Sequence, residues 1–166
     1  KYINSPETEF YKKGKTVFNL DKAKALRADT NEVIIVEGYM DVVSLYSAGI
    51  KNVISNSGTA LTETQIELVW KFFSNPIICL DGDQSGQKAA LRIAEKLIIS
   101  INENNKIHFS ILPKGEDPDD FIKKNGKEKF IEFLKSKKII QSYIWDTYLS
   151  EVNNNNPFEI SKFEKK

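Results

Sequence analysis

The sequence predicts an α/β fold built on a mostly parallel sheet, and this prediction follows from two observations. Short apolar runs rich in β-branched residues recur at 33–36, 52–55, 77–80 and 107–112. Runs of this kind form strands that are covered on both faces. Segments with helical spacing of apolar residues separate one run from the next. Strands that alternate with helices in this way give a parallel sheet with right-handed crossovers.

The separating segments also carry helix signals of their own. A helix is expected to begin at Asp41, where apolar residues recur at helical spacing. Thr62 and Gln65 have the spacing of a capping box at the start of a helix over 63–73. A longer helix is expected over 86–101, with its apolar residues on one face. From residue 121 to about 149 the pattern predicts further amphipathic helices.

Bulk composition limits the class of protein. With 166 residues, 40% of them hydrophobic and 28% charged, the chain can bury a core as one ordinary domain. A net charge of +1 does not by itself indicate a nucleic-acid binder. The single cysteine excludes an internal disulfide and fits a reducing cytoplasm. No apolar run is long enough to span a membrane, and the missing initiator Met predicts a piece of a longer protein.

Acidic residues follow two of the predicted strands at the point where each strand ends. Glu37 and Gly38 come after the first strand, and Asp81, Gly82 and Asp83 come after the third. The carboxyl ends of parallel strands meet at one edge of a sheet, so these acids are expected to converge. Carboxylates held close together repel one another unless a cation neutralises them. Oxygen ligands alone favour a hard cation, so the sequence predicts a Mg²⁺ site.

Three more acids are candidates for the same site, each with a plainer alternative. Asp41 lies one turn beyond Glu37, although an N-cap role would also explain it. Asp117 precedes Pro118, which is the pattern of a helix N-cap followed by its first residue. Asp119 is expected on the same side as Asp117 if the loop is extended, where the pair would bind a second metal or support the first.

Candidate phosphate contacts lie in two other stretches. Gly58 and Thr59, at a strand-to-helix junction, can direct backbone N–H groups at a phosphate. Lys1, Lys13 and Lys15 are candidate phosphate contacts without base readout. Two other reactive residue types are expected to be structural. His108 is interpreted as a packing or surface residue, and Cys79 as a small buried hydrophobe.

These motifs resemble a known family. The stretch from Val36 to Asp41, followed by Asp81-Gly82-Asp83, resembles the TOPRIM domain shared by primases, topoisomerases and some nucleases. The resemblance to bacterial replicative DNA primases is closer, and it rests on additional stretches: Lys1-Tyr2-Ile3-Asn4-Ser5-Pro6-Glu7-Thr8, Lys13-Gly14-Lys15, Gly58-Thr59, Gln84-Ser85-Gly86 and Gly115-Glu116-Asp117-Pro118-Asp119.

The resemblance implies a fold and a division of the chain. It implies a TOPRIM-like, Rossmann-type mostly parallel sheet flanked by helices, with a short helical C-terminal appendage. Residues 1–30 would end the N-terminal part of a polymerase core, 31–125 would form the TOPRIM domain, and 126–166 a helical subdomain and linker.

The resemblance also implies an activity, which is the synthesis of short RNA primers on single-stranded DNA from ribonucleoside triphosphates by two-metal-ion nucleotidyl transfer. Glu37, Asp81 and Asp83 would be catalytic and would bind Mg²⁺ or Mn²⁺, with Asp41, Asp117 and Asp119 supporting them or binding further ions. Nucleic acid or nucleotide would contact Lys1, Tyr2, Lys13, Lys15, Gly58 and Thr59. Zinc is expected only in an upstream module, which this sequence lacks.

Implied partners are a replicative helicase and single-strand binding protein, contacted through regions outside this chain, at replication forks in the cytoplasm and away from any membrane. Two alternatives remain open at this point. One is a TOPRIM nuclease or topoisomerase that cuts strands with Mg²⁺. The other is a non-catalytic scaffold that keeps the sheet without a working site.

Overall fold

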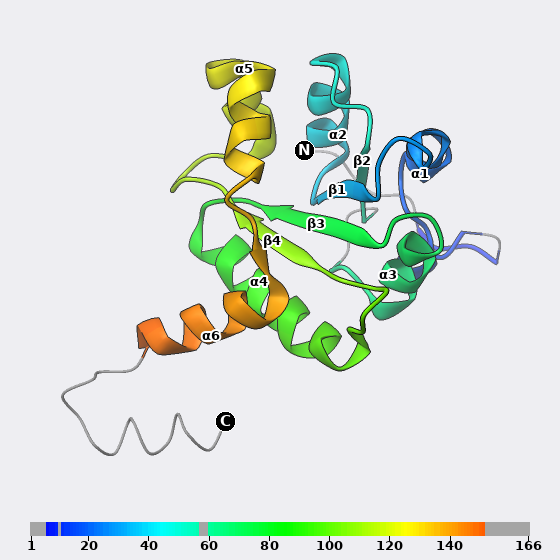
Figure 1. Ribbon diagram of the computed structural model, residues 1–166. Helices are drawn as coiled ribbons and strands as arrows, with labels where there is room; N and C mark the ends of the chain where they lie inside the picture. Colours follow the sequence, from blue (N-terminus) through cyan, green and yellow to red (C-terminus); the bar gives the residue numbers. More distant parts are fainter. Residues whose placement is uncertain (1–5, 10, 57–59, 152–166) are drawn as a thin grey trace.

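The computed structural model describes residues 6–9, 11–56 and 60–151, and a five-stranded sheet lies at its centre (Figure 1). The strand order is β2-β1-β3-β4-β5. The first four strands are parallel, and β5 runs antiparallel to β4. This confirms the mostly parallel α/β prediction. The strands span Glu32–Val36 (β1), Val53–Ser55 (β2), Asn75–Leu80 (β3), His108–Ile111 (β4) and Lys138–Ile139 (β5).

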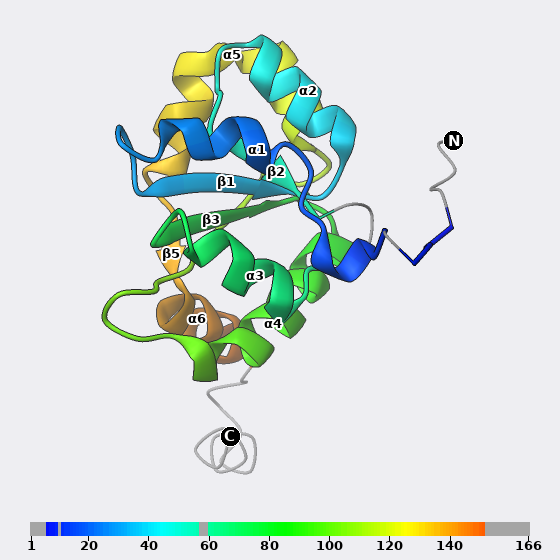
Figure 2. The same ribbon diagram turned by 90° about the vertical axis from the view of Figure 1, so that its right-hand side faces the viewer.

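Helices cover both faces of the sheet (Figures 1 and 2). One face carries α2 (Tyr39–Ser47) and α5 (Pro118–Leu134), and the other carries α3 (Glu63–Trp70), α4 (Gln84–Leu97) and α6 (Ile140–Glu151). The remaining short helices are α1 (Leu20–Ala23), η1 (Lys13–Lys15), η2 (Lys24–Leu26) and η3 (Ile98–Ser100). Among the described residues, no helix has both the length and the apolar character that crossing a membrane requires.

The alternation of side chains along β1 explains why residues 33–36 are all apolar. Val33 and Ile35 join the core beneath α3 and α4, whereas Ile34 and Val36 join the core beneath α2 and α5. All four side chains are buried. Successive strand residues point to opposite faces, so a strand covered on both sides has no position left for a polar side chain.

Several helix boundaries differ from the prediction because local capping decides them. The expected capping box is confirmed, since Thr62 accepts the N–H of Gln65 and the Gln65 side chain accepts the N–H of Thr62. Helix α2 begins at Tyr39, two residues before Asp41, because Gly38 is its N-cap. Helix α4 begins at Gln84, two residues earlier than expected, because Asp83 caps it.

The chain after residue 134 contains a strand that the sequence did not predict. The two residues of β5 pair with the outer edge of β4, with Ile139 opposite His108. A two-residue strand is too short to leave a period in the sequence. The helical remainder of this region, α6, agrees with the predicted amphipathic helices, although Trp145 on it is 58% exposed.

Candidate metal centre at the carboxyl edge of the sheet

Glu37 directly follows β1, at the edge where the parallel strands end. Its carboxylate accepts a hydrogen bond from the backbone N–H of Asp81, which follows the neighbouring strand β3. Burial raises the pKa of Glu37, and the negative charges of Asp41 and Asp83 raise it further. The two strand ends therefore meet as predicted, and Glu37 faces the Asp81 loop.

Asp81 is one of two acids at this edge, with Asp41, whose pKa is raised to about 6. Burial raises the pKa of Asp81 to about 6, with smaller contributions from Glu37, Asp117 and Asp83. Its Oδ1 atom is buried and has no hydrogen-bond partner among the described residues. A buried carboxylate oxygen without a donor is costly unless a cation replaces the lost water. The donor set, which is oxygen only, fits a hard divalent ion.

Asp83 has a structural role that the metal prediction did not include. It is the N-cap of α4, and its Oδ1 accepts the N–H of Gly86 at 2.7 Å. The sequence predicts that Asp81 and Asp83 share one ion, and this stays a prediction. Their surroundings differ, because Asp83 is exposed and has one oxygen committed to the helix end while Asp81 is partly buried. Asp83 is nevertheless close enough to raise the pKa of both Glu37 and Asp81.

Asp41 lies in the first turn of α2 and bonds back toward the strand. Its Oδ2 accepts the N–H of Gly38 at 3.0 Å, so it acts from the third helical position and is not the N-cap that the sequence suggested. Burial raises the pKa of Asp41 to about 6, and the nearby charges of Asp117 and Asp81 contribute. Asp41 thus fixes the Glu37–Gly38 turn while adding negative charge beside Asp81.

The loop is not extended from Asp117 to Asp119, so the condition for placing them on the same side is not met, and the alternative helix N-cap role is confirmed for Asp117. Asp117 is the N-cap of α5 and accepts the N–H of Asp120 at 2.7 Å, so Asp119 is already helical. Asp119 instead accepts the hydroxyl of Ser44 and pairs with Lys123 at 2.5 Å. The Lys123 ammonium first, and then the Ser44 hydroxyl, lower the pKa of Asp119. Sequence reasoning missed Ser44, because only the packing of α2 against α5 brings it to Asp119.

The loop that carries Asp81 is held by close backbone contacts. The N–H of Gly82 donates to the carbonyl of Glu116 at 3.0 Å. A Cβ atom on Gly82 would overlap the carbonyl oxygens of Leu112 and Pro113, and one on Gly86 would overlap the carbonyl of Asp81. Glycine is therefore required at both positions, and it lets the acidic loop pack directly on the β4–α5 connection.

The acids share one edge without forming a closed coordination shell. Within residues 6–9, 11–56 and 60–151, no group of three His, Cys, Asp or Glu side chains is arranged to hold a metal ion. The mutual effects on pKa nevertheless link Glu37, Asp41, Asp81, Asp83 and Asp117. An edge of this kind can concentrate a divalent ion and orient a phosphate near it.

The candidate phosphate contacts are placed only in part. Lys13 and Lys15 lie in η1, which is fastened to the start of α3. The side chain of Gln65 donates to the carbonyl of Lys13 at 3.0 Å, and the hydroxyl of Thr62 donates to the carbonyl of Gly14 at 2.7 Å. The other predicted contacts, Lys1, Tyr2, Gly58 and Thr59, lie outside the described residues.

Cys79 and His108 were both expected to be structural. Cys79 is fully buried, and burial raises the pKa of its thiol, which keeps it protonated. His108 lies in β4 with burial lowering the pKa of its imidazole, and Lys137 lowers it further. The negative charges of Asp41 and Asp81 also raise the pKa of the Cys79 thiol, and its complete burial confirms the prediction of a small buried residue.

The fold and this acidic edge define a class of protein. Residues 34–122, which contain both strand ends and the start of α5, match the Toprim-like family. The match extends over more than half of the chain. The chain therefore belongs to the Toprim-like family.

Within that class, its relatives are bacterial DNA primases. The DNA primase of Escherichia coli (strain K12) is 35% identical over 157 residues, which are 95% of this chain and 27% of the relative. The DNA primase of Pseudomonas aeruginosa PAO1 is 38% identical over 130 residues, 78% of this chain and 20% of the relative. The solved DnaG primase catalytic domain bound to ssDNA has a TM-score of 0.91 and 33% identity, covering 99% of this chain and 53% of that one.

The chain thus spans about a quarter of the length of these curated relatives and about half of the solved domain.

Proposed function

We propose that this chain is the metal-binding part of a primase catalytic core, which synthesises short RNA primers on single-stranded DNA by nucleotidyl transfer. The observation that carries the proposal is the buried Oδ1 of Asp81, which has no partner among the described residues and lies beside other acids. Its position at the ends of neighbouring parallel strands, in a chain related to primases, favours polymerisation chemistry. The division of the chain at residues 30 and 125 belongs to the same proposal.

Each acid has a role in this proposal. Glu37 and Asp81 hold Mg²⁺ or Mn²⁺, and Asp83 adds its uncommitted oxygen. Asp41 orients the Glu37 turn through Gly38 and increases the local negative charge. Asp117 contributes charge beside Asp81. A metal role for Asp119 would require it to give up Lys123, so we assign it to positioning α5 against α2.

When bound, divalent ions would lower the pKa of the attacking hydroxyl and neutralise charge on the leaving pyrophosphate. The side chains contribute position and field in place of covalent chemistry. Lys13 and Lys15 are proposed to contact phosphates from η1, which Gln65 and Thr62 hold in place. Ribonucleoside triphosphates, a helicase, single-strand binding protein and a location at replication forks are part of the same proposal.

The test uses the full-length protein with a single-stranded template, ribonucleotides and Mg²⁺. Replacing Glu37 with Gln should abolish primer synthesis while leaving the circular dichroism spectrum unchanged, because within the described residues the carboxylate accepts a hydrogen bond only from the Asp81 N–H, which the amide oxygen of Gln can also accept. Asp146→Asn is the matched control, since Asp146 is an acid of α6 that pairs with Lys138 of β5 at 2.6 Å.

Two outcomes would contradict the proposal. Primer synthesis retained by Glu37→Gln would show that the acidic edge is not catalytic. Mg²⁺-dependent nicking or relaxation of supercoiled plasmid, without primer synthesis, would favour a strand-cleaving Toprim enzyme.

A further inference from the structure

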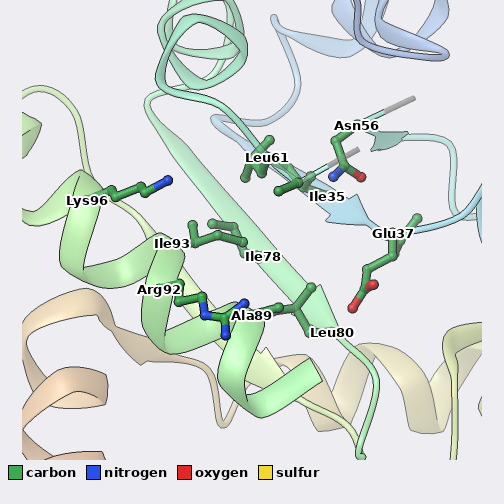
Figure 3. A pocket seen from close by; sticks show the side chains of 12 residues that line it. Ile35, Glu37, Asn56, Leu61, Ile78, Leu80, Ala89, Arg92, Ile93 and Lys96 are labelled. Carbon is green, nitrogen blue, oxygen red and sulfur yellow. The ribbon is translucent and has the colours of Figure 1, made fainter. Parts of the chain in front are cut away.

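Two of the pockets in this fold lie on opposite faces of the sheet. The larger, of about 490 Å³, lies on the face that carries α3 and α4; it is lined by Arg92 and adjoins the acidic edge through Glu37 (Figure 3). The smaller, of about 360 Å³, lies on the other face, between the loop after α2 and the C-terminal half of α5. We call it the amino-edge pocket, because Glu32, the first residue of β1, lines it.

The amino-edge pocket is remote from the candidate metal centre. Strand β1 begins at Glu32, and Glu37 directly follows its last residue. Five residues of strand extend about 16 Å, at roughly 3.3 Å per residue. None of the five acids of the carboxyl edge is among the described residues that line this pocket. A molecule bound here would therefore leave the metal centre accessible.

The floor of the amino-edge pocket is aliphatic. Ile34 of β1, Ile50 of the loop after α2 and Ile77 of β3 line it and are each no more than 4% exposed. Among the described residues that line the pocket, none is aromatic and none is an arginine. Bases of single strands bind by stacking on aromatic rings, and phosphates favour the planar fork of arginine. The floor therefore fits an apolar side chain better than it fits a nucleotide.

The rim of the pocket carries an apolar residue between two lysines. Lys127, Ile131 and Lys135 all line the pocket and follow one another at intervals of four residues along α5 and its C-cap. Residues at this spacing are neighbours on one face of a helix. The Ile131 side chain is 44% exposed. The three side chains thus form a stripe of charge, apolar surface and charge along the opening.

The positive charge of this rim is only partly neutralised. Glu32 is the one acid among the described lining residues, and it pairs with Lys137 at 3.1 Å. Lys127 donates to the carbonyl of Gly49 at 3.0 Å, and a lysine ammonium has two further donors. Within the described part of the chain, neither Lys127 nor Lys135 forms an ion pair. The rim is therefore complementary to a ligand with negative charge.

We propose that the amino-edge pocket docks an acidic peptide segment of a partner protein, with one apolar side chain on the aliphatic floor and carboxylates at Lys127 and Lys135. Lysine acts as a point charge and can pair with a carboxylate without the bidentate geometry that arginine offers. An apolar anchor in a pocket with charged groups around it is the usual anatomy of a protein interface. The inference goes beyond the proposed function, because it adds an attachment site that is separate from the metal centre.

The direct test titrates the methyl-labelled full-length protein with a short peptide in which leucine and phenylalanine are flanked by aspartates. The methyl resonances of Ile34, Ile50 and Ile131 should shift and saturate. Those of Ile78 and Ile93, which line the larger pocket, should not move. The same peptide with asparagine in place of every aspartate should bind about tenfold more weakly, because its charge-assisted contacts are lost. Serine in place of leucine and phenylalanine should weaken binding to a similar extent.

Variants of the rim test each part of the proposal against a matched control. Lys135→Glu should raise the Kd of the acidic peptide about tenfold or more, since an attraction becomes a repulsion. Lys129→Glu makes the same change of charge at an exposed position of α5 that does not line the pocket, and it should alter the Kd by less than about twofold. Ile131→Ala should weaken binding about fivefold, whereas Ile99→Ala, at a residue that is 86% exposed in η3, should have no effect.

Several outcomes would overturn the inference. These are an absence of methyl shifts at about 1 mM peptide, or equal effects of Lys135→Glu and Lys129→Glu. Shifts of the same methyl groups with a single-stranded oligonucleotide, abolished by Lys135→Glu, would assign the pocket to nucleic acid instead. Equally tight binding of succinate would show a site for small anions. Primer synthesis by Lys135→Glu should match that of the wild-type protein, and its loss would contradict the separation of this pocket from the metal centre.

Discussion

Acidic side chains on two sides of this molecule differ in what neutralises them. Four acids near α5, β5 and α6 are paired with lysines at 2.5–3.1 Å: Asp119 with Lys123, Glu116 with Lys124, Glu32 with Lys137 and Asp146 with Lys138. At the carboxyl edge of the sheet, Glu37, Asp41 and Asp81 have other acids as their charged neighbours. None of these three forms an ion pair within the described ranges.

The same chemical group therefore has opposite properties on the two sides. Lys123 lowers the pKa of Asp119, whereas burial and neighbouring acids raise the pKa of Asp81 to about 6. A shortage of cations does not explain this, since the chain has 24 Lys and Arg for 23 Asp and Glu. Under the proposed function, a bound divalent cation would offset this repulsion at the carboxyl edge.

The largest expected effect is on metal affinity. Asp81→Asn should weaken Mn²⁺ binding by about a hundredfold or more, because the buried oxygen that lacks a donor is replaced by a neutral amide. Asp146→Asn should change it by less than about twofold, since that exposed acid already has Lys138. Calorimetric titration with Mn²⁺ measures both. If the two variants behave alike, the distinction between the two sides does not concern metal binding.

The loop that carries Asp81 and Asp83 is held by close backbone contacts at Gly82, and Gly82→Ala should disrupt these contacts. The added Cβ would overlap the carbonyls of Leu112 and Pro113, so we expect a loss of about 3 kcal/mol in the free energy of unfolding. Gly14→Ala is the control, because its Cβ would meet only the Thr62 methyl at an ordinary 3.5 Å. Urea unfolding compares the two variants. Equal stability would show that the loop can move away from Pro113.

Without metal, the unpaired acids of the carboxyl edge and the acids paired with lysines should affect the free energy of unfolding in opposite directions. A carboxyl whose folded pKa is raised destabilises the fold once pH exceeds the unfolded value near 4, and fully so above about 6. Asp81→Asn should therefore raise the free energy of unfolding at neutral pH by about 1 kcal/mol, after allowance for solvent screening. Asp119→Asn should lower it by less than about 1 kcal/mol, because an attractive pair is lost.

Thermal unfolding in EDTA should show a higher melting temperature for Asp81→Asn and a lower one for Asp119→Asn than for the wild-type protein. Excess Mg²⁺ should then raise the melting temperature of the wild-type protein more than that of Asp81→Asn. A loss of stability in Asp81→Asn without metal would indicate that its carboxylate has a structural partner after all.

The smallest expected effect concerns His108, which is remote from the acidic edge. Its pKa is lowered, first by burial and then by Lys137, so the folded state binds protons less readily than the unfolded state. Stability should therefore fall as pH drops below the ordinary histidine value of 6.5. In His108→Gln, the part of this loss of stability that comes from histidine protonation should be absent. Melting temperatures at about pH 7.5 and pH 5 compare the two proteins, and parallel changes would contradict the prediction.

Local pattern was sufficient for much of the fold and for the place of the site. The apolar runs that became β1 and β3 could be recognised because strands buried on both faces lack polar residues. The spacing of Thr62 and Gln65 predicted a capping box that depends on three residues of backbone. Acids that follow two parallel strands lie at the same edge of the sheet, so the proximity of Glu37 and Asp81 could be predicted from the sequence.

By itself, then, the sequence determined the four parallel strands, the main helices between them and the residues of the acidic edge, because periodicity and capping act over a few residues. Only the tertiary structure decided which acids are neutralised. Ser44 reaches Asp119 across 75 positions, and Gly82 lies against Pro113 through the packing of two loops. The pocket beneath Arg92 depends in the same way on α4 lying over β1 and β3. Contacts between distant segments produce no periodic pattern in a sequence. They form only when the strands have paired and the helices have packed on the sheet.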